Sequence, residues 1–157
     1  AMGALVSGGI RLINYDVVRL MNTTQFAIDA VVAKAQEQIE HLERLYRNGW
    51  PALEVHERIV ILVDEGIATG ATMRYAVQAL KRRSPASIIV AAPSASRDSL
   101  AMLNEHVEKS VFLSSPDPYI SVGRWYEDYT MISDEKVSEL LIKATTALCM
   151  SSRRPVH

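Results

Sequence analysis

Apolar residues in the second half of this chain form short continuous runs separated by segments with helical spacing. Continuous runs of strand length occupy 59–63, 87–92 and 110–113. Helical spacing follows the first two runs, over about 72–83 and 97–108. Because continuous apolar strands that alternate with helices are typical of parallel sheets, we expect an α/β fold with helices covering both faces of the sheet.

The beginning of the chain has a different pattern. Two short apolar runs, 2–6 and 10–13, flank Ser7-Gly8-Gly9. This predicts a β-hairpin, because glycine accepts the positive φ angles that a tight turn requires. The next segment, 14–21, has no clear period, and we expect one or two helical turns there.

Two further helices are expected. The first is long, with Thr23 or Thr24 as its cap, an apolar stripe at helical spacing, and Asn48-Gly49 as its stop. The second begins at Ser133-Asp134-Glu135, where a capping residue and early acids suit the helix dipole, and runs to about Met150.

Composition indicates a single domain of ordinary globular type. The chain has 157 residues, 48% of them apolar and 22% charged, and we assign 1–150 to one domain and 151–157 to a polar tail. With 17 basic and 18 acidic residues, nucleic acid and anionic membranes are not expected partners. The sequence shows no apolar run of the ~18 residues that a membrane helix needs and no signal peptide. The one cysteine, Cys149, rules out an intrachain disulfide; we expect it to be buried, and we expect a cytoplasmic protein.

The segment Val60–Thr72 carries the most informative chemistry. A predicted buried strand ends in Asp64-Glu65, and a loop of small residues leads directly into a helix. Ligands of open α/β sheets bind at the carboxyl ends of the strands, and loop N–H groups at a helix N-terminus favour phosphate. Gly70 allows close approach of the backbone, and Thr69 and Thr72 add hydroxyl donors. The segment therefore predicts a phosphate-binding loop.

The acidic pair indicates what is attached to the phosphate. Asp64 and Glu65 are suited to accepting hydrogen bonds from vicinal sugar hydroxyls, so the whole segment predicts a site for ribose 5-phosphate. The alternative is that the two carboxylates only cap a loop. A Walker-type nucleotide loop is excluded, since no Gly-Lys-Ser/Thr follows the strand. Ser94 and Ser96 lack a Gly-x-Ser-x-Gly turn, and we expect helix caps there rather than nucleophiles.

The same segment resembles the signature of the type I phosphoribosyltransferases, in which a strand, an acidic pair and a Thr-Gly-x-Thr loop hold phosphoribosyl pyrophosphate. By this resemblance the catalytic pair, Asp64 and Glu65, would hold the ribose 2′ and 3′ hydroxyls. The 5′-phosphate would be held by Ala68, Thr69, Gly70, Ala71 and Thr72. In the 6-oxopurine members of the family an aspartate that serves purine N7 precedes the Thr-Gly. This chain has Ala68 at that position, which argues against that mechanism.

A second segment, Pro118–Tyr129, resembles the part of these enzymes that forms a hood over the base. It offers a flat aromatic surface beside hydrogen-bonding side chains. Arg124, Trp125 and Tyr126 are the candidates for binding a base. The alternative is that these aromatic side chains pack at the edge of the core.

The layout as a whole resembles a group of bacterial predicted phosphoribosyltransferases. In that group the domain begins well upstream, with a strand, a helix and a loop that binds pyrophosphate. The resemblance therefore implies a type I phosphoribosyltransferase-like parallel sheet, with an N-terminal hairpin and long helix, whose first strand and pyrophosphate loop are missing. An apolar sheet edge would then be exposed, and we expect a homo-oligomer that covers it.

The activity that the resemblance implies is transfer of ribose 5-phosphate from phosphoribosyl pyrophosphate to a nucleobase-like, small-molecule acceptor, with release of pyrophosphate. Mg²⁺ is expected with the pyrophosphate, bound through substrate oxygens rather than in a protein metal site. The alternative is a non-catalytic sensor of phosphoribosyl pyrophosphate or of a nucleotide 5′-phosphate. The pyrophosphate loop separates the two hypotheses, because an enzyme needs it and a 5′-phosphate sensor does not.

Overall fold

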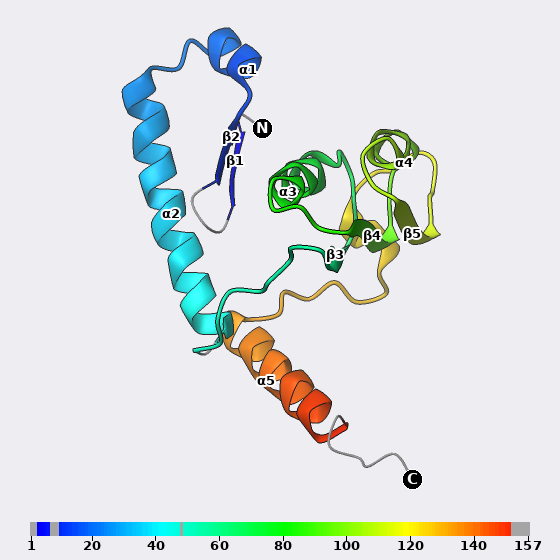
Figure 1. The fold of residues 1–157 in the computed structure, drawn as a ribbon. Helices are drawn as coiled ribbons and strands as arrows, with labels where there is room; N and C mark the ends of the chain where they lie inside the picture. Colours follow the sequence, from blue (N-terminus) through cyan, green and yellow to red (C-terminus); the bar gives the residue numbers. More distant parts are fainter. Residues whose placement is uncertain (1–2, 7–9, 48, 152–157) are drawn as a thin grey trace.

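The computed structural model describes residues 3–6, 10–47 and 49–151, in two small sheets and five α-helices of very different length (Figure 1). In chain order the elements are β1 (Gly3–Val6), β2 (Ile10–Ile13), α1 (Tyr15–Leu20), α2 (Gln25–Arg47), β3 (Ile59–Val63), α3 (Ala71–Lys81), β4 (Ser87–Ser94), α4 (Arg97–Asn104), β5 (Lys109–Ser114), the 3₁₀ helix η1 (Val122–Trp125) and α5 (Asp134–Ser151). The Gly8-Gly9 turn, the Asn48 helix stop, the side chain of Cys149 and the 152–157 tail lie outside the described residues.

The central sheet is parallel, with strand order β3-β4-β5, which confirms the predicted α/β class. Several elements differ in their bounds from the prediction, and α4 differs most. β4 continues two residues further, to Ser94, and α4 ends at Asn104 instead of continuing to Glu108. The helix stops early because Glu108 returns to the beginning of β4, where its carboxylate accepts the Ile88 N–H at 2.6 Å and its own N–H donates to the Ile88 carbonyl at 3.2 Å.

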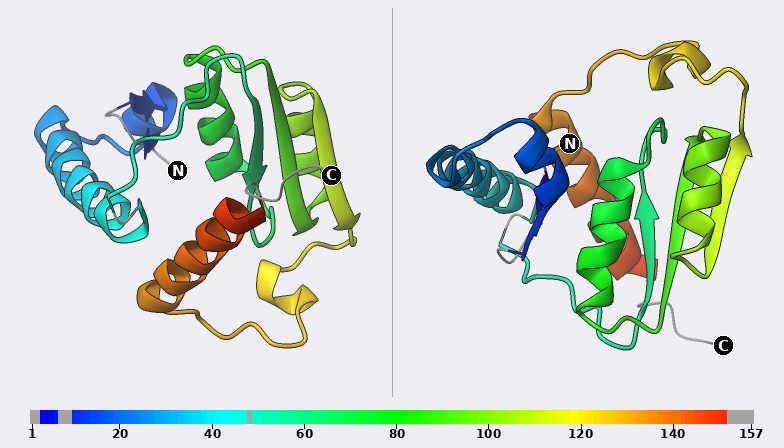
Figure 2. Two further views of the ribbon diagram at one scale, coloured as in Figure 1. Left: turned by 60° about the horizontal axis from the view of Figure 1, so that its bottom comes forward. Right: turned by 90° about the horizontal axis from the view of Figure 1, so that it is seen from above.

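The expectation that helices cover both faces of this sheet is wrong. α3 and α4 lie on the same face, and Ile88, Val90 and Leu103 are almost completely buried between sheet and helices (Figure 2). On the opposite face the side chains of β3 and β5 are exposed: Ile59, Ile61, Val63, Val111 and Leu113. The reason is topological. Right-handed crossovers between strands added successively in one direction place all the connecting helices on one side.

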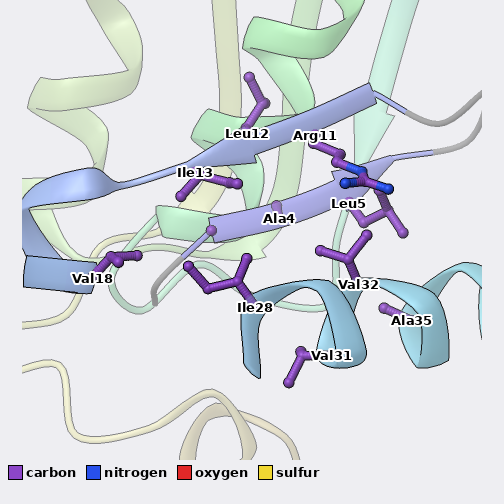
Figure 3. A pocket seen from close by; sticks show the side chains of 11 residues that line it. Ala4, Leu5, Arg11, Leu12, Ile13, Val18, Ile28, Val31, Val32 and Ala35 are labelled. Carbon is purple, nitrogen blue, oxygen red and sulfur yellow. The ribbon is translucent and has the colours of Figure 1, made fainter. Parts of the chain in front are cut away.

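The N-terminal hairpin forms as predicted, with β1 antiparallel to β2 and Gly3 opposite Ile13. It packs on α3, where Leu12 meets Tyr75 and Ala79. On the other side of the hairpin, an apolar pocket of about 250 Å³ lies between the hairpin and α2 (Figure 3). This pocket lies away from the segment in which the sequence places the chemistry.

The two long helices, α2 and α5, contact each other at their ends (Figure 1). Thr24 caps α2 by accepting the Ala27 N–H at 3.3 Å, which decides between the two predicted caps. Tyr46 Oη donates to the Asp134 carboxylate at 2.6 Å, and Ser138 Oγ donates to the Leu45 carbonyl at 3.1 Å. Across the described ranges, no helix is both long and apolar enough to span a bilayer.

Candidate functional site

The acidic pair and the loop after it follow β3 along the edge of β4. Asp64 N–H donates to the Ala91 carbonyl at 3.2 Å, and Ile67 N–H donates to the Ser94 carbonyl at 2.9 Å. Ile67 also forms an isolated parallel bridge with Ala95. The chain thus continues beside β4 after β3 ends, which places the acidic pair at the carboxyl end of the sheet, where the sequence predicted a ligand site.

Two serines hold the loop in place from α4. The hydroxyl groups of Ser96 and Ser99 both donate to the Ala68 carbonyl at 2.7 Å. Ser96 is the N-cap of α4 and accepts the Ser99 N–H at 3.1 Å, as predicted. The same prediction was wrong for Ser94, which is a buried residue of β4. Because β4 runs further than expected, its hydroxyl lies inside the fold and pairs with Tyr119 Oη at 2.9 Å.

Gly70 makes the turn from the loop into α3. Its φ is +68°, in the left-handed region that favours glycine, and a Cβ atom there would lie 2.6 Å from Cε of Met102. Glycine has no side chain to cap the helix. Ala71 N–H donates to Thr69 Oγ1 at 3.4 Å, and the N–H groups that follow it in the first turn of α3 are oriented for an anion. Thr69 and Thr72 are exposed beside them, as a phosphate loop requires.

The predicted catalytic and phosphate-binding residues line a single pocket of about 330 Å³. Its walls are the continuous segment 64–73 and Val122. The structure therefore brings together Asp64, Glu65, Ala68, Thr69, Gly70, Ala71 and Thr72. The assignment of ribose hydroxyls to the first two and phosphate to the others remains a prediction that this geometry permits.

The two carboxyl groups differ strongly in acidity. Burial raises the pKa of Asp64 to about 6, and a hydrogen bond with Glu65 and the negative charge of Glu65 act in the same direction. The pKa of Glu65 is lowered, first because its carboxylate accepts that hydrogen bond. Below about pH 6 the pair therefore holds one proton, on Asp64, and loses acceptor capacity for sugar hydroxyls.

The aromatic segment after β5 packs against the acidic pair. Tyr126 Oη donates to the Glu65 carbonyl at 2.5 Å, and Tyr129 Oη donates to Glu65 Oε1 at 3.4 Å. At Gly66 an added Cβ would lie 2.6 Å from Cγ1 of Val122, so the two segments touch closely. The aromatic side chains thus position Glu65, a role that the sequence did not indicate.

A second pocket, of about 630 Å³, adjoins the first and shares Ala68 and Thr69 with it. Among the described residues that line either pocket, none is a predicted base-binding residue. Arg124 and Trp125 lie in η1, the ring of Trp125 is 6.2 Å from that of Tyr119, and Tyr126 supports Glu65. Tyr119 does line the second pocket, and its position after the Pro-Asp-Pro turn was the available signal.

Within the described residues there is no group of three or more His, Cys, Asp or Glu side chains that could hold a metal ion. The acidic side chains that line the first pocket are those of Asp64 and Glu65, and these are the groups that a cation bound there would meet.

The fold, the strand-to-loop geometry and the acidic pair define an α/β domain with a phosphate-type loop at the carboxyl end of its parallel sheet. Residues 12–124 match the family described as "Phosphoribosyl transferase domain", and the chain belongs to this family.

Two curated relatives, both from Mycobacterium tuberculosis, are named "Putative phosphoribosyl transferase MT0597" (strain CDC 1551 / Oshkosh) and "Putative phosphoribosyl transferase Rv0571c" (strain ATCC 25618 / H37Rv). Each is 32% identical to this chain over 144 residues, which is 92% of this chain and 32% of the relative. The chain thus spans about a third of the length of these relatives. The crystal structure of TT1426 from Thermus thermophilus is similar, with a TM-score of 0.74 and 29% identity, over 91% of this chain and 67% of that one.

Proposed function

We propose that this chain binds the ribose 5-phosphate group of phosphoribosyl pyrophosphate at Asp64–Thr72 and serves in its transfer to a nucleobase-like acceptor. The observation that carries the proposal is the single pocket in which an acidic pair and a phosphate-type loop meet at the carboxyl end of a parallel strand. Family membership and the relatives' names support a phosphoribosyl transferase in general.

In the proposed reaction a nitrogen of the acceptor forms a bond to ribose C1′ while the bond from C1′ to the pyrophosphate oxygen breaks. The electron pair of that bond leaves with pyrophosphate, and the acceptor nitrogen loses its proton. Asp64 and Glu65 would hold the vicinal hydroxyls, and their negative charge would favour the positive charge that develops on the ring. The loop would fix the 5′-phosphate, so the chain contributes mainly positioning and electrostatics.

Mg²⁺, when bound, would neutralise the charge of the leaving pyrophosphate. The donor groups in the pocket fit a weakly held ion of this kind, since Mg²⁺ keeps most of its waters and binds through substrate oxygens. Asp64 and Glu65 are the residues that would contact it, through water or through the ribose hydroxyls.

A second candidate is a non-catalytic sensor of phosphoribosyl pyrophosphate or a nucleotide 5′-phosphate. It is favoured by the make-up of the pocket, whose walls come from one continuous segment, 64–73, and Val122. This lining accounts for one phosphate group and a sugar. A sensor would need no more than this.

Calorimetric titration with ribose 5-phosphate and with phosphoribosyl pyrophosphate, both with Mg²⁺, tests the site. We expect binding of ribose 5-phosphate that the double variant Asp64→Asn/Thr69→Ala abolishes, while the control Asp16→Asn, an exposed residue outside the pocket, leaves it unchanged. Equal affinity for the two ligands favours a sensor of a 5′-phosphate. Much tighter binding of phosphoribosyl pyrophosphate is expected of the transferase and of a sensor of that ligand. If neither ligand binds, the proposed site is wrong.

We also propose that the chain self-associates through the uncovered face of the central sheet. Ile59, Ile61 and Val63 of β3 are 60–74% exposed, and an apolar surface of this kind is typical of an interface. Light scattering should give a mass above that of a monomer, and Ile61→Lys should reduce it, whereas Val31→Lys on α2 should not. A monomeric mass for the unchanged protein at high concentration contradicts this proposal.

A further inference from the structure

We propose that the apolar pocket between the hairpin and α2, the hairpin pocket, is a binding site for a small monocarboxylic acid with an apolar tail, such as a short-chain fatty acid. The inference goes beyond the proposed function, because this pocket shares no residue with the two pockets at the phosphate loop.

The hairpin pocket is apolar and has the size of a small ligand. Its walls include Leu5 and Ile13 of the hairpin, Val18 of α1, and Ile28 and Val32 of α2. Its volume is about 250 Å³. An engineered apolar cavity of about 150 Å³ is already large enough to hold benzene, so a hydrocarbon tail of similar size fits here.

The hairpin places one cation among these apolar side chains. Successive side chains of a strand point to opposite faces, so Arg11 and Ile13 share one face of β2. Leu5 lies directly opposite Arg11 on β1, and both residues line the pocket. Figure 3 shows Arg11 at one end of the pocket and Val18 at the other. Among the lining residues that the structure describes, Arg11 is the charged one.

The ion pair that Arg11 makes does not explain its place in this wall. Arg11 Nη1 lies 3.7 Å from Asp29 Oδ1, a separation too long for a hydrogen bond. The two side chains are 55% and 54% exposed, and ion pairs this accessible contribute little to stability. The same oxygen of Asp29 already accepts a hydrogen bond from Gln25 Nε2 at 3.1 Å. Arg11 can therefore bind another anion without leaving Asp29 unpaired.

These features define the class of ligand. A guanidinium binds a carboxylate through two parallel hydrogen bonds, and one guanidinium balances one negative charge. A second charged group on the ligand would lie against apolar walls, which is unfavourable. Each methylene that the walls bury raises the affinity by up to about fourfold, so the tail contributes as well as the charge.

The test follows the amide NMR signals of the hairpin and α2 during titration with hexanoate, butanoate and hexanol. We expect hexanoate to bind about tenfold more tightly than butanoate, because it has two more methylene groups to bury. We expect it to bind about fivefold more tightly than hexanol, which has a similar tail and no charge.

Two variants separate the charge from the tail. Arg11→Gln should remove the preference for hexanoate over hexanol and leave the affinity for hexanol unchanged, whereas Arg11→Lys should keep the preference. Ala35→Phe places a ring in the pocket and should weaken the binding of both compounds about tenfold. The matched control Arg19→Gln, at an exposed arginine of α1 outside the pocket, should bind like the unchanged protein.

Several outcomes would overturn the inference. It is wrong if hexanoate gives no saturable shift of the hairpin and α2 signals, or if hexanol binds as tightly as hexanoate. It is also wrong if Arg11→Gln keeps the preference for hexanoate, or if Arg11→Lys loses it while still binding hexanol. None of these results depends on the binding of ribose 5-phosphate, so the inference and the proposed function can fail separately.

Discussion

A Gly70→Ala variant is expected to bind ribose 5-phosphate about 10–100-fold more weakly, which corresponds to losing one or two hydrogen bonds from N–H groups to a charged phosphate. Gly70 has a φ of +68°, and a methyl group there would lie 2.6 Å from Cε of Met102 and 3.3 Å from Cβ of Ser99. The end of the Met102 side chain can move aside, but the contact with Ser99 Cβ and the left-handed φ still oppose a methyl group, so the turn shifts and the first N–H groups of α3 move with it. Calorimetry measures the effect directly.

Gly49 provides the matched control for backbone strain. It also has a positive φ, of +84°, but an added Cβ there would have no atom within 4 Å. Gly49→Ala should therefore cost stability, on the order of 1 kcal/mol for a left-handed alanine, without changing the affinity for ribose 5-phosphate. If Gly70→Ala also retains full affinity, the loop does not bind the phosphate through its backbone.

An Asp64→Asn variant is expected to bind ribose 5-phosphate about tenfold more weakly and yet to melt at a higher temperature above about pH 7. The affinity falls because an amide accepts hydrogen bonds less strongly than a carboxylate. The stability rises because the folded protein disfavours the ionised Asp64, whose pKa of about 6 lies above the ordinary value of 3.8. The destabilisation is present above about pH 6 and disappears as the pH falls from about 6 to about 4.

Thermal unfolding of both proteins across this pH range measures the effect. The two melting temperatures should converge as the pH falls below about 4, where Asp64 becomes protonated in folded and unfolded chains alike. Asp16→Asn, at an exposed residue on α1, should show no such convergence. A melting-temperature difference for Asp64→Asn that does not change with pH would mean that Asp64 is not buried with its charge opposed by Glu65.

The sequence was sufficient for most of the sheet and for the loop because both are encoded locally. The run 59–63 is continuous and apolar, and Gly70 lies where a strand-to-helix turn needs positive φ, so β3 and the turn could be predicted residue by residue. Which face of the sheet the helices cover could not be predicted in this way. It depends on the order and hand of the crossovers, which place α3 and α4 together and leave Ile61 exposed.

The long-range part of the site was likewise hidden. Ser99 bonds to Ala68 from 31 positions away, and Tyr126 bonds to Glu65 from 61 positions away, and no local pattern predicts which partners such hydroxyls will find. The resemblance of segment 118–129 to the hood over the base suggested that Tyr126 would face a ligand. In the structure its hydroxyl reaches the backbone of the acidic pair instead.

The serine bonds to Ala68 have a consequence for how the site can work. Ser96 and Ser99 bind the Ala68 carbonyl, and β4 binds the Ile67 N–H. The loop therefore loses its conformational entropy when the protein folds, before any ligand binds. A rigid loop favours rapid binding of a ligand, but it cannot close over the bound ligand. Any movement that shields the reacting sugar from water falls to parts held less firmly, such as the tyrosine-rich segment whose hydroxyls touch Glu65.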